Sequence, residues 1–204
     1  MLELTRKLDF LQNFSFFLSG GTGLALQIGY RKSFDMDFFT PKEFSPEELS
    51  MTITSHNLTM EGRIIRHGTL HCILEKVKTS FIFYNELLLF PLKVFNSIYV
   101  ADWRDIIVEK LRTIAERGQK KDFYDFYFAV QMLGIDTLTE LVFKKFGKRV
   151  NYFHLLKGLS YFEDADRNPE PLLLSKGIKW DEVKRFFLNN IQEFERAFSR
   201  IKDF

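Results

Sequence analysis

The segment from residue 19 to residue 40 constrains the fold of this chain most strongly. It reads SGGTGLALQIGYRKSFDMDFFT, so an apolar run ends in two glycines and two aspartates follow, one residue apart, among aromatic residues. The preceding run FSFFLSG is short and stopped by glycine, as in a buried strand. GLALQIGY has helical character with Thr22 as its expected cap, and DMDFFT is expected to be a second strand, closed by Pro41. The segment therefore predicts a strand–helix–strand unit.

The two aspartates of this unit, Asp35 and Asp37, are predicted to converge on one point. Residues two apart on a strand have side chains on the same side. Two carboxylates held so close repel each other and raise each other's pKa unless a cation lies between them. Hard oxygen ligands of this kind suit Mg²⁺, which takes one or two protein carboxylates together with phosphate oxygens. The alternative is a pair of ordinary surface acids on a solvated edge strand.

Gly20 and Gly21 occupy the predicted junction between the first strand and the helix. Glycine permits a close approach of the backbone, and the start of a helix offers unpaired N–H groups to an anion. A phosphate held at this turn and a metal held by the aspartates would be neighbours, which is the layout for positioning a nucleoside triphosphate. A plain tight turn is the structural alternative.

The remaining sequence predicts an α/β (α+β) fold. Residues 45–58 begin with a proline in the first turn of a helix, and three strand-like runs follow at hairpin spacing, over residues 62–67, 70–76 and 79–85. From residue 101 onward the apolar residues recur at helical spacing. We expect a nucleotide-binding domain over residues 1–98, with a mixed sheet of about five strands and flanking helices. A C-terminal helical bundle over residues 99–204 is expected to close its cleft.

Composition narrows the class of protein. With 204 residues and 46% hydrophobic residues, the chain is long enough to bury a core. The formal net charge of +2 is too small to indicate by itself a protein that wraps a polyanion. Cys72 is the only cysteine, so no disulfide forms within the chain, and no apolar stretch approaches the roughly 18 residues that cross a bilayer. We expect a cytoplasmic protein with no membrane partner.

The histidines and the cysteine are expected to be structural. His67 and His71 lie four apart in a predicted hairpin, and no His-Glu-x-x-His pattern is present. Cys72 alternates with apolar residues, which indicates a core position.

Three motifs together resemble the nucleotidyltransferase superfamily related to DNA polymerase β, in which a Gly-Gly or Gly-Ser turn and a helix precede an Asp-x-Asp or Asp-x-Glu strand. More narrowly, the chain is similar to the AbiEii/AbiGii-type toxin family. The similarity lies in Gly-Gly-Thr-x-Leu-x-Leu from Gly20, Arg-x-Ser-x-Asp-x-Asp-Phe-Phe from Arg31, and the downstream run EKLRTIAERGQKKDFYDFY. It extends over residues 16–130.

The resemblance implies a set of site residues. The metal, Mg²⁺ or Mn²⁺, is expected at Asp35 and Asp37. The nucleoside triphosphate is expected to contact Gly20, Gly21, Thr22, Arg31, Ser33, Lys78 and Arg117. The expected catalytic residues are Asp35, Asp37, Lys110, Asp122 and Asp125.

Spacing alone is also consistent with ordinary structural roles for the downstream residues. Lys110 and Arg117 are seven apart on a predicted helix and share a face, which is equally typical of a solvated surface. Asp122 and Asp125 also share a face, and helix capping accounts for at least one of them about as well as catalysis does. Lys78 is also consistent with an ordinary lysine of a hairpin turn.

One position departs from the family pattern. The resemblance implies a Lys-x-Asp on a later strand, and the matching residues here are Lys78, Thr79 and Ser80. Ser80 replaces the third carboxylate, so Glu75 or Glu86 would have to reach the site in its place.

Two functions therefore stay open. The first is a nucleotidyltransferase of the bacterial toxin–antitoxin type, with a cognate antitoxin as expected partner. It would transfer a nucleotidyl group from a nucleoside triphosphate to an RNA such as tRNA, or to a protein. The second is a nucleotide-binding or interaction module that retains the fold and the cation site but is catalytically impaired.

Overall fold

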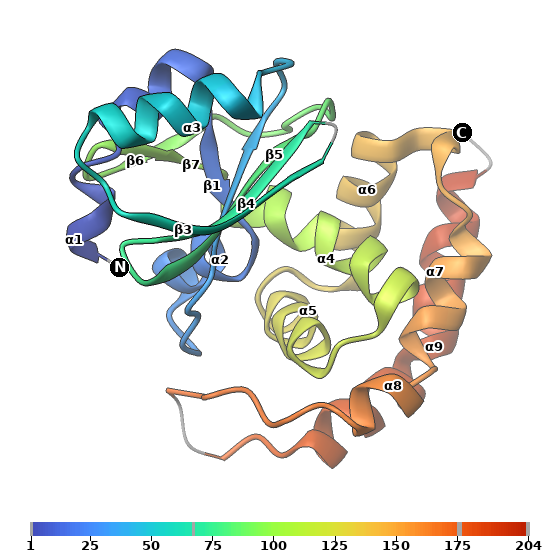
Figure 1. The fold of residues 1–204 in the computed structure, drawn as a ribbon. Helices are drawn as coiled ribbons and strands as arrows, with labels where there is room; N and C mark the ends of the chain where they lie inside the picture. Colours follow the sequence, from blue (N-terminus) through green and yellow to red (C-terminus); the bar gives the residue numbers. More distant parts are fainter. Residues whose placement is uncertain (1, 67, 175–176, 203–204) are drawn as a thin grey trace. The chain divides into compact units, whose positions relative to one another are not determined.

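The computed structural model describes residues 2–66, 68–174 and 177–202 and divides into two compact units, Met1–Trp103 and Arg104–Phe204. His67, which the sequence analysis places in a hairpin, lies outside the described residues. The first unit is built around a sheet and the second consists of helices (Figure 1).

The sheet of the first unit has seven strands in the order β3-β4-β5-β2-β1-β7-β6. Strand β2 lies at its centre, antiparallel to β1 and parallel to β5. The predicted mixed sheet is confirmed, and it has seven strands where about five were predicted. The strands are β1 (Phe17–Ser19), β2 (Met36–Thr40), β3 (Met60–Arg66), β4 (Thr69–Leu74), β5 (Val77–Phe83), β6 (Lys93–Phe95) and β7 (Ile98–Val100).

The two additional strands, β6 and β7, escaped the sequence analysis because each has three residues, too few to establish an alternation. They form a hairpin whose turn contains Asn96 with φ of 50°. Strand β7 pairs in parallel with β1, with Phe17 opposite Tyr99. This pairing joins residues about eighty positions apart, which local periodicity does not encode.

The helical segments of the first unit are α1 (Leu2–Thr5), the 3₁₀ helix η1 (Asp9–Phe14), α2 (Gly20–Ile28) and α3 (Pro46–Ser55). Helix α3 begins as predicted, with proline in its first turn and the Ser45 hydroxyl accepting the Glu48 N–H at 3.1 Å. Helix α2 begins at Gly20, three residues earlier than expected. The prediction that Thr22 caps it is wrong, because the Thr22 hydroxyl donates instead to the carbonyl of Asp35.

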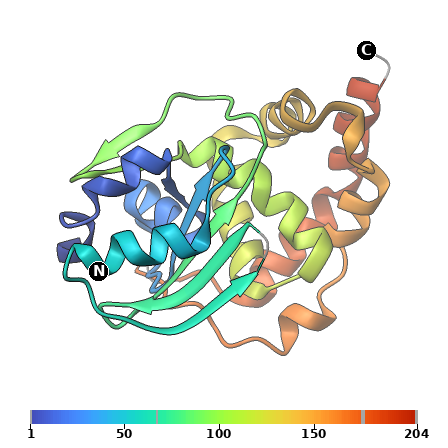
Figure 2. The ribbon, with the colours of Figure 1, turned by 45° about the horizontal axis from the view of Figure 1, so that its top comes forward.

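The core of the first unit covers one face of the sheet. Phe38 and Phe81 are fully buried and stack with ring centroids 5.5 Å apart. Leu49 and Ile53 of α3 belong to the same buried cluster, and Figure 2 shows α3 lying along the strands. Because side chains alternate along β2, packing Phe38 into this core sends Asp37 to the opposite face.

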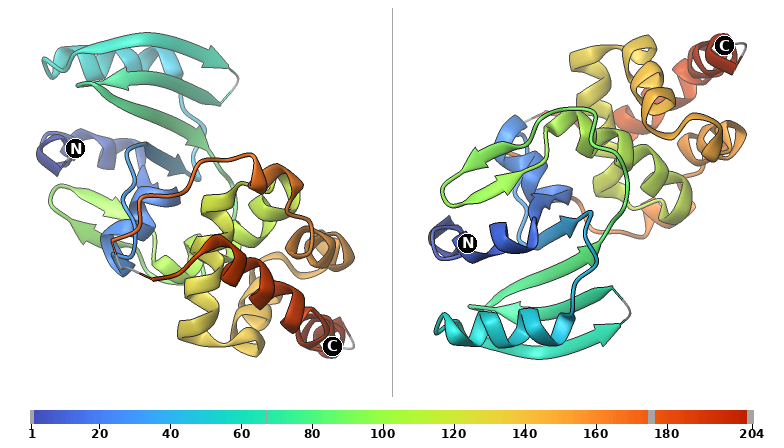
Figure 3. Two further views of the ribbon diagram at one scale, coloured as in Figure 1. Left: turned by 90° about the horizontal axis from the view of Figure 1, so that it is seen from below. Right: turned by 90° about the horizontal axis from the view of Figure 1, so that it is seen from above.

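The second unit contains six α-helices among its described residues: α4 (Trp103–Arg117), which begins at the last residue of the first unit, α5 (Lys120–Leu133), α6 (Ile135–Phe146), α7 (Tyr152–Leu159), α8 (Glu163–Asp166) and α9 (Trp180–Lys202). Helix α9 packs along α6 and α7 (Figure 3). The predicted helical back half is confirmed. None of the described helices is by itself long and apolar enough to cross a bilayer; α5 and the segment Ile135–Arg149 pass that test of length and composition only as a pair bent by 112°.

Helices α4 and α7 approach each other closely at Gly158. A Cβ atom added to Gly158 would lie 2.6 Å from the Cα of Ala115. Backbone atoms cannot move aside as a flexible side-chain end can, so this position has no room for a larger residue.

We therefore expect Gly158→Ala to destabilise the protein by about 2 kcal/mol, the usual range for forcing extra volume into a packed site. Thermal or urea unfolding measures the change. Lys157→Ala on the same helix is the control and should unfold like the wild type. Equal stability of Gly158→Ala and the wild type would show that the two helices are not in contact at this point.

Candidate functional site

The glycine turn lies directly against the carboxylate of Asp37. Ser19, the last residue of β1, is the antiparallel partner of Asp37 on β2. Gly20 follows with φ of +61°, and a Cβ atom added to it would lie 3.0 Å from Oδ2 of Asp37. Any other residue at this position would be strained and would crowd the carboxylate. Glycine is thus required for both reasons, conformation and space.

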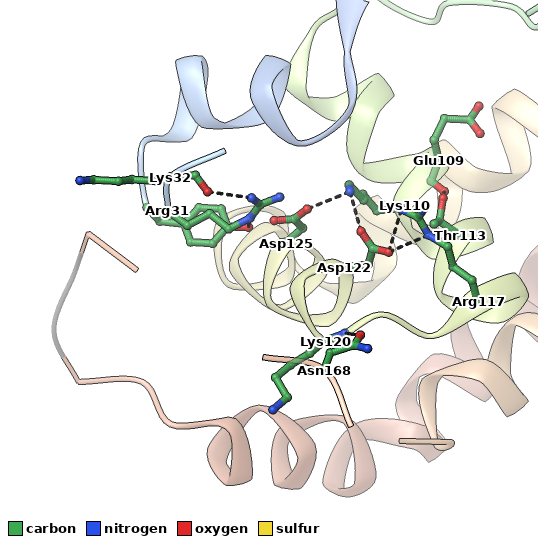
Figure 4. Close-up of polar contacts among 11 residues, drawn as sticks. Arg31, Lys32, Glu109, Lys110, Thr113, Arg117, Lys120, Asp122, Asp125 and Asn168 are labelled. Carbon is green, nitrogen blue, oxygen red and sulfur yellow. Dashed lines mark hydrogen bonds and ion pairs between the residues drawn. The ribbon is translucent and has the colours of Figure 1, made fainter. Parts of the chain in front are cut away.

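Gly21 makes a second close approach, to the segment that leads into β2. A Cβ atom added to Gly21 would lie 2.8 Å from Nη2 of Arg31 and 2.9 Å from Oγ of Ser33. The Arg31 side chain is buried; its Nε donates to the Tyr30 hydroxyl at 3.2 Å and its Nη1 to the Lys32 carbonyl at 3.0 Å (Figure 4). The turn therefore brings a guanidinium and a hydroxyl next to the backbone of Gly21.

Asp35 is held in place through its backbone rather than its side chain. It precedes β2, which begins at Met36, so the strand starts one residue later than predicted. The hydroxyl of Thr22 on α2 donates to the Asp35 carbonyl and ties helix and strand together. The side chains of Asp35 and Asp37 are both half-buried, so water or a ligand reaches them.

The oxygen atoms at this turn suit a hard divalent cation. Asp35 and Asp37 offer two carboxylates, and Mg²⁺ is commonly held by one or two carboxylates with phosphate oxygens completing the shell. In the described part of the chain, no group of three or more His, Cys, Asp or Glu side chains is arranged to hold a metal ion. As a donor set, two carboxylates fit a cation whose other ligands are phosphate and water oxygens.

The position of the missing third carboxylate is next to Asp37. Ser80 on β5 is the parallel partner of Asp37, and its side chain is 7% exposed. Its Oγ lies 3.1 Å from Nδ1 of His71, its antiparallel partner on β4. The sequence analysis expected His71 to be structural. The register of the β4–β5 hairpin places it beside Ser80, on the face of the sheet that carries Asp37.

Neither glutamate considered as a substitute belongs to β5, the strand that pairs with Asp37. Glu75 sits in the β4–β5 turn, where its carboxylate accepts the Thr59 N–H at 2.6 Å. That hydrogen bond lowers the pKa of Glu75 below its ordinary value. Glu86 follows β5, three residues beyond Phe83, whereas Ser80 is the middle residue of the strand. The β5 position beside Asp37 is therefore occupied by Ser80 without a replacement from either glutamate.

Lys78 lies on the same side of β5 as Ser80 because the two residues are two positions apart. Its side chain is exposed. Lys78 belongs to the strand proper, with Ile73 as its partner, and not to the hairpin turn. It therefore adds a positive charge to the face of the sheet that carries Asp37.

The other predicted site residues form a network within the helical unit (Figure 4). Nζ of Lys110 on α4 lies 2.6 Å from Oδ1 of Asp122 and 3.0 Å from Oδ2 of Asp125, both on α5. Arg117, whose side chain is 50% exposed, lies 3.2 Å from Oδ2 of Asp122. All four residues are thus in one connected network, as the helical spacing of each pair predicts. The Lys110 ammonium is buried, which differs from a solvated helix face.

Asp122 and Asp125 share the Lys110 ammonium, but their pKa values shift in opposite directions. Burial opposes ionisation of Asp122, but the charges of Lys110 and Arg117 outweigh it and hold the pKa of Asp122 below its ordinary value. Complete burial raises the pKa of Asp125 well above its ordinary value. Asp122 is therefore the ionised partner of the two cations, and Asp125 is the carboxyl that more readily holds a proton.

We expect Asp122→Asn to destabilise the protein by about 3 kcal/mol at pH 7, because it leaves a buried ammonium with less compensating charge. The lowered pKa means that this contribution is present above the pKa of an unfolded aspartate, about 3.9, and is lost as the pH falls through the pKa of the folded group. Urea unfolding at a series of pH values measures it.

The control for this substitution is Asp136→Asn. Asp136 pairs with Arg200 at 3.3 Å, and both side chains are more than 60% exposed, so its removal should have little effect at any pH. The network would be contradicted if Asp122→Asn lowered the free energy of unfolding no more than Asp136→Asn does. It would also be contradicted if the effect of Asp122→Asn were the same at pH 7 and pH 3.

Comparisons with known proteins place the chain in a sequence family. A family model described as the nucleotidyl transferase AbiEii toxin of a type IV toxin–antitoxin system matches residues 69–200. The uncharacterized protein aq_aa25 of Aquifex aeolicus (strain VF5) is 35% identical over 184 residues, which are 88% of this chain and 87% of that protein. The family match begins at β4, and the Aquifex relative extends the similarity over most of the chain.

Two solved structures share the fold. JHP933 from Helicobacter pylori has a TM-score of 0.57 at 17% identity, covering 98% of this chain and 91% of that chain. A second H. pylori protein, proposed to be a nucleotidyltransferase, has a TM-score of 0.54 at 15% identity, covering 98% and 94%. The extent of the family match, together with the Aquifex relative, identifies the sequence family. The chain belongs to the nucleotidyl transferase AbiEii toxin family of type IV toxin–antitoxin systems.

Proposed function

We propose that the protein is a Mg²⁺-dependent toxin that transfers a nucleotidyl group from a nucleoside triphosphate, with loss of pyrophosphate, to an RNA such as tRNA or to a protein hydroxyl. The observation that supports this most strongly is the 3.0 Å approach between the position of a Cβ on Gly20 and Oδ2 of Asp37. A backbone turn that close to a carboxylate offers amide N–H groups for phosphate beside oxygen atoms for a cation.

Each residue at the turn has a proposed role. Asp35 and Asp37 hold the cation, which when bound supplies positive charge against the phosphate oxygens. The N–H groups at the start of α2, at Gly20, Gly21 and Thr22, bind phosphate. Because Arg31 and Ser33 lie against Gly21, they orient the triphosphate there. Catalysis would rest on positioning and on neutralising charge at phosphorus.

Three cations and two acids complete the proposed machinery. The exposed Lys78 neutralises triphosphate charge from the face of the sheet that carries Asp37. Arg117 is half-exposed and offers a further donor, while Lys110 positions Asp122 and Asp125 through its buried contacts. The assignment of Lys110, Asp122 and Asp125 to catalysis rests on the family, because their contacts alone also describe a stabilising ion network.

The biological setting follows from the family. A type IV toxin–antitoxin system supplies a cognate antitoxin as partner. We place the protein in the cytoplasm, where nucleoside triphosphates and RNA acceptors are available; the one cysteine, Cys72, is buried, and burial raises its pKa to about 11.

A catalytically impaired nucleotide-binding module is the alternative. Ser80 favours it, because this serine stands beside Asp37 where the family pattern has an acid. Such a module would bind Mg²⁺ and a nucleoside triphosphate without turnover.

We expect Asp37→Asn to abolish transfer of label from α-³²P nucleoside triphosphates to total bacterial RNA or protein, by about a hundredfold or more, because it removes charge stabilisation at the reacting phosphate. Each of the four nucleotides is assayed separately with Mg²⁺. Circular dichroism confirms that the variant folds. Asp9→Asn, an exposed aspartate of η1, is the matched control and should retain activity.

The outcomes separate the two functions. Label that depends on Asp37 establishes the transferase, and the labelled species names the acceptor. Failure of the wild type to label any acceptor, with Mg²⁺-dependent triphosphate binding retained, would overturn the transferase in favour of the module.

A further inference from the structure

A row of polar side chains crosses the sheet through Asp37. Strand register places Ser19, Asp37, Ser80 and His71 side by side on β1, β2, β5 and β4. Cross-strand partners have side chains on the same face, and adjacent strands are about 4.8 Å apart. Ser80 is thus the immediate neighbour of Asp37, and His71 is the neighbour of Ser80 on the side away from Asp37.

Two groups of this row, Ser80 and His71, are in hydrogen-bond contact. Nδ1 of His71 lies 3.1 Å from Oγ of Ser80. The Ser80 side chain is buried, whereas the His71 ring is half-buried and accessible to solvent protons. The imidazole is therefore able to take a proton from the serine side and exchange it with water.

This contact is outside the apolar core of the unit. The neighbouring residues Leu70, Cys72 and Phe81 have side chains on the opposite face and belong to the buried cluster there. A single cross-strand hydrogen bond on the other face adds little to that core. The histidine and the serine are instead paired on the face that carries Asp37.

The charged groups around His71 come from both neighbouring strands. On β3 its partner is the uncharged Ile64, flanked by Glu61 opposite Ile73 and Arg66 opposite Thr69. On β5 the flanking charge is Lys78, opposite Ile73, and Asp37 lies one strand further. Two of these neighbours, Arg66 and Lys78, are positive, and two, Glu61 and Asp37, are negative.

We propose that Ser80 and His71 replace the third carboxylate of this site as a proton-accepting pair. The inference rests on the proposed nucleotidyl transfer. Ser80 is the catalytic residue because its Oγ would touch the acceptor hydroxyl, and His71 is a positioning residue that acts through Ser80. The 3.1 Å distance permits either direction of hydrogen bonding; the pair requires the tautomer in which the Ser80 hydroxyl donates to an unprotonated Nδ1.

The proton balance is complete. As the acceptor oxygen forms its bond to the α-phosphorus, the bond from that phosphorus to the pyrophosphate oxygen breaks and pyrophosphate leaves. The acceptor's proton passes to Oγ of Ser80, while the proton of the Ser80 hydroxyl passes to Nδ1 of His71. The imidazolium then releases its proton to water.

The pair predicts a distinctive pH profile. Only unprotonated imidazole accepts a proton, so kcat/KM of the wild type should fall at acidic pH. His71→Asn keeps an amide near the position of Nδ1 but accepts no proton. We expect it to lower kcat/KM by about a hundredfold and to remove this acidic limb. His154→Asn, at an exposed site on α7, is the control with unchanged activity.

A restoring substitution makes the test specific. In the His71→Asn background, Ser80→Asp supplies the missing carboxylate directly, so we expect it to recover most of the lost activity. Simple structural damage by His71→Asn would not be repaired in this way. Affinity for a non-hydrolysable triphosphate with Mn²⁺ should stay within about twofold in all these variants, because neither residue binds the nucleotide.

A readout independent of turnover is the ¹⁵N spectrum of the imidazole ring. We expect the neutral His71 ring to carry its proton on Nε2, and Ser80→Ala to shift the Nδ1 resonance. A proton on Nδ1, or an Nδ1 resonance unaffected by Ser80→Ala, would overturn the pair. An active wild type whose pH profile is matched by His71→Asn would also overturn it while leaving the transferase intact. An inactive wild type would instead refute the proposed function itself.

Discussion

The site depends on one close approach, that of the backbone of Gly20 to the carboxylate of Asp37. The last residue of β1 is paired with Asp37, so the chain must leave the strand and begin α2 within a side chain's width of an acid. Only glycine meets both the positive φ and the lack of space. With the start of a helix fixed beside a carboxylate, amide donors and carboxylate oxygens become neighbours without any further arrangement.

The two faces of the sheet carry different side chains around Asp37. Phe38 and Phe81 lie in the aromatic core on one face, and the alternation of β2 and β5 then presents Asp37 and Ser80 on the other. A shift of one residue in register would exchange the two sets, burying the acids and exposing the rings. Packing of the core therefore also determines which face carries Asp37 and Ser80. In this way an apolar unit positions a small number of polar side chains.

Local patterns were enough to predict the strand–helix–strand unit, the α3 start and the helical back half, because each depends on residues close in sequence. Local patterns did not predict strand pairings and side-chain contacts between residues far apart in the sequence. The short strand β7 takes its place by pairing with β1, and β6 by pairing with β7. The Thr22 hydroxyl donates to the Asp35 carbonyl instead of capping the helix. Spacing correctly grouped Lys110 with Arg117, but the burial of Lys110 between two aspartates needed the packing of α4 on α5. The contact of His71 with Ser80 likewise follows only from hairpin register.

The most direct test of a metal–nucleotide site at the glycine turn is paramagnetic broadening of amide resonances by Mn²⁺ bound with a non-hydrolysable nucleoside triphosphate. Amides of Gly20, Gly21 and Asp37 should broaden first, while that of Val94 on the edge strand β6 stays sharp. The combined Asp35→Asn and Asp37→Asn substitutions should abolish the effect. Broadening that spares the glycine turn, or that persists without the two aspartates, would contradict a cation site at this position.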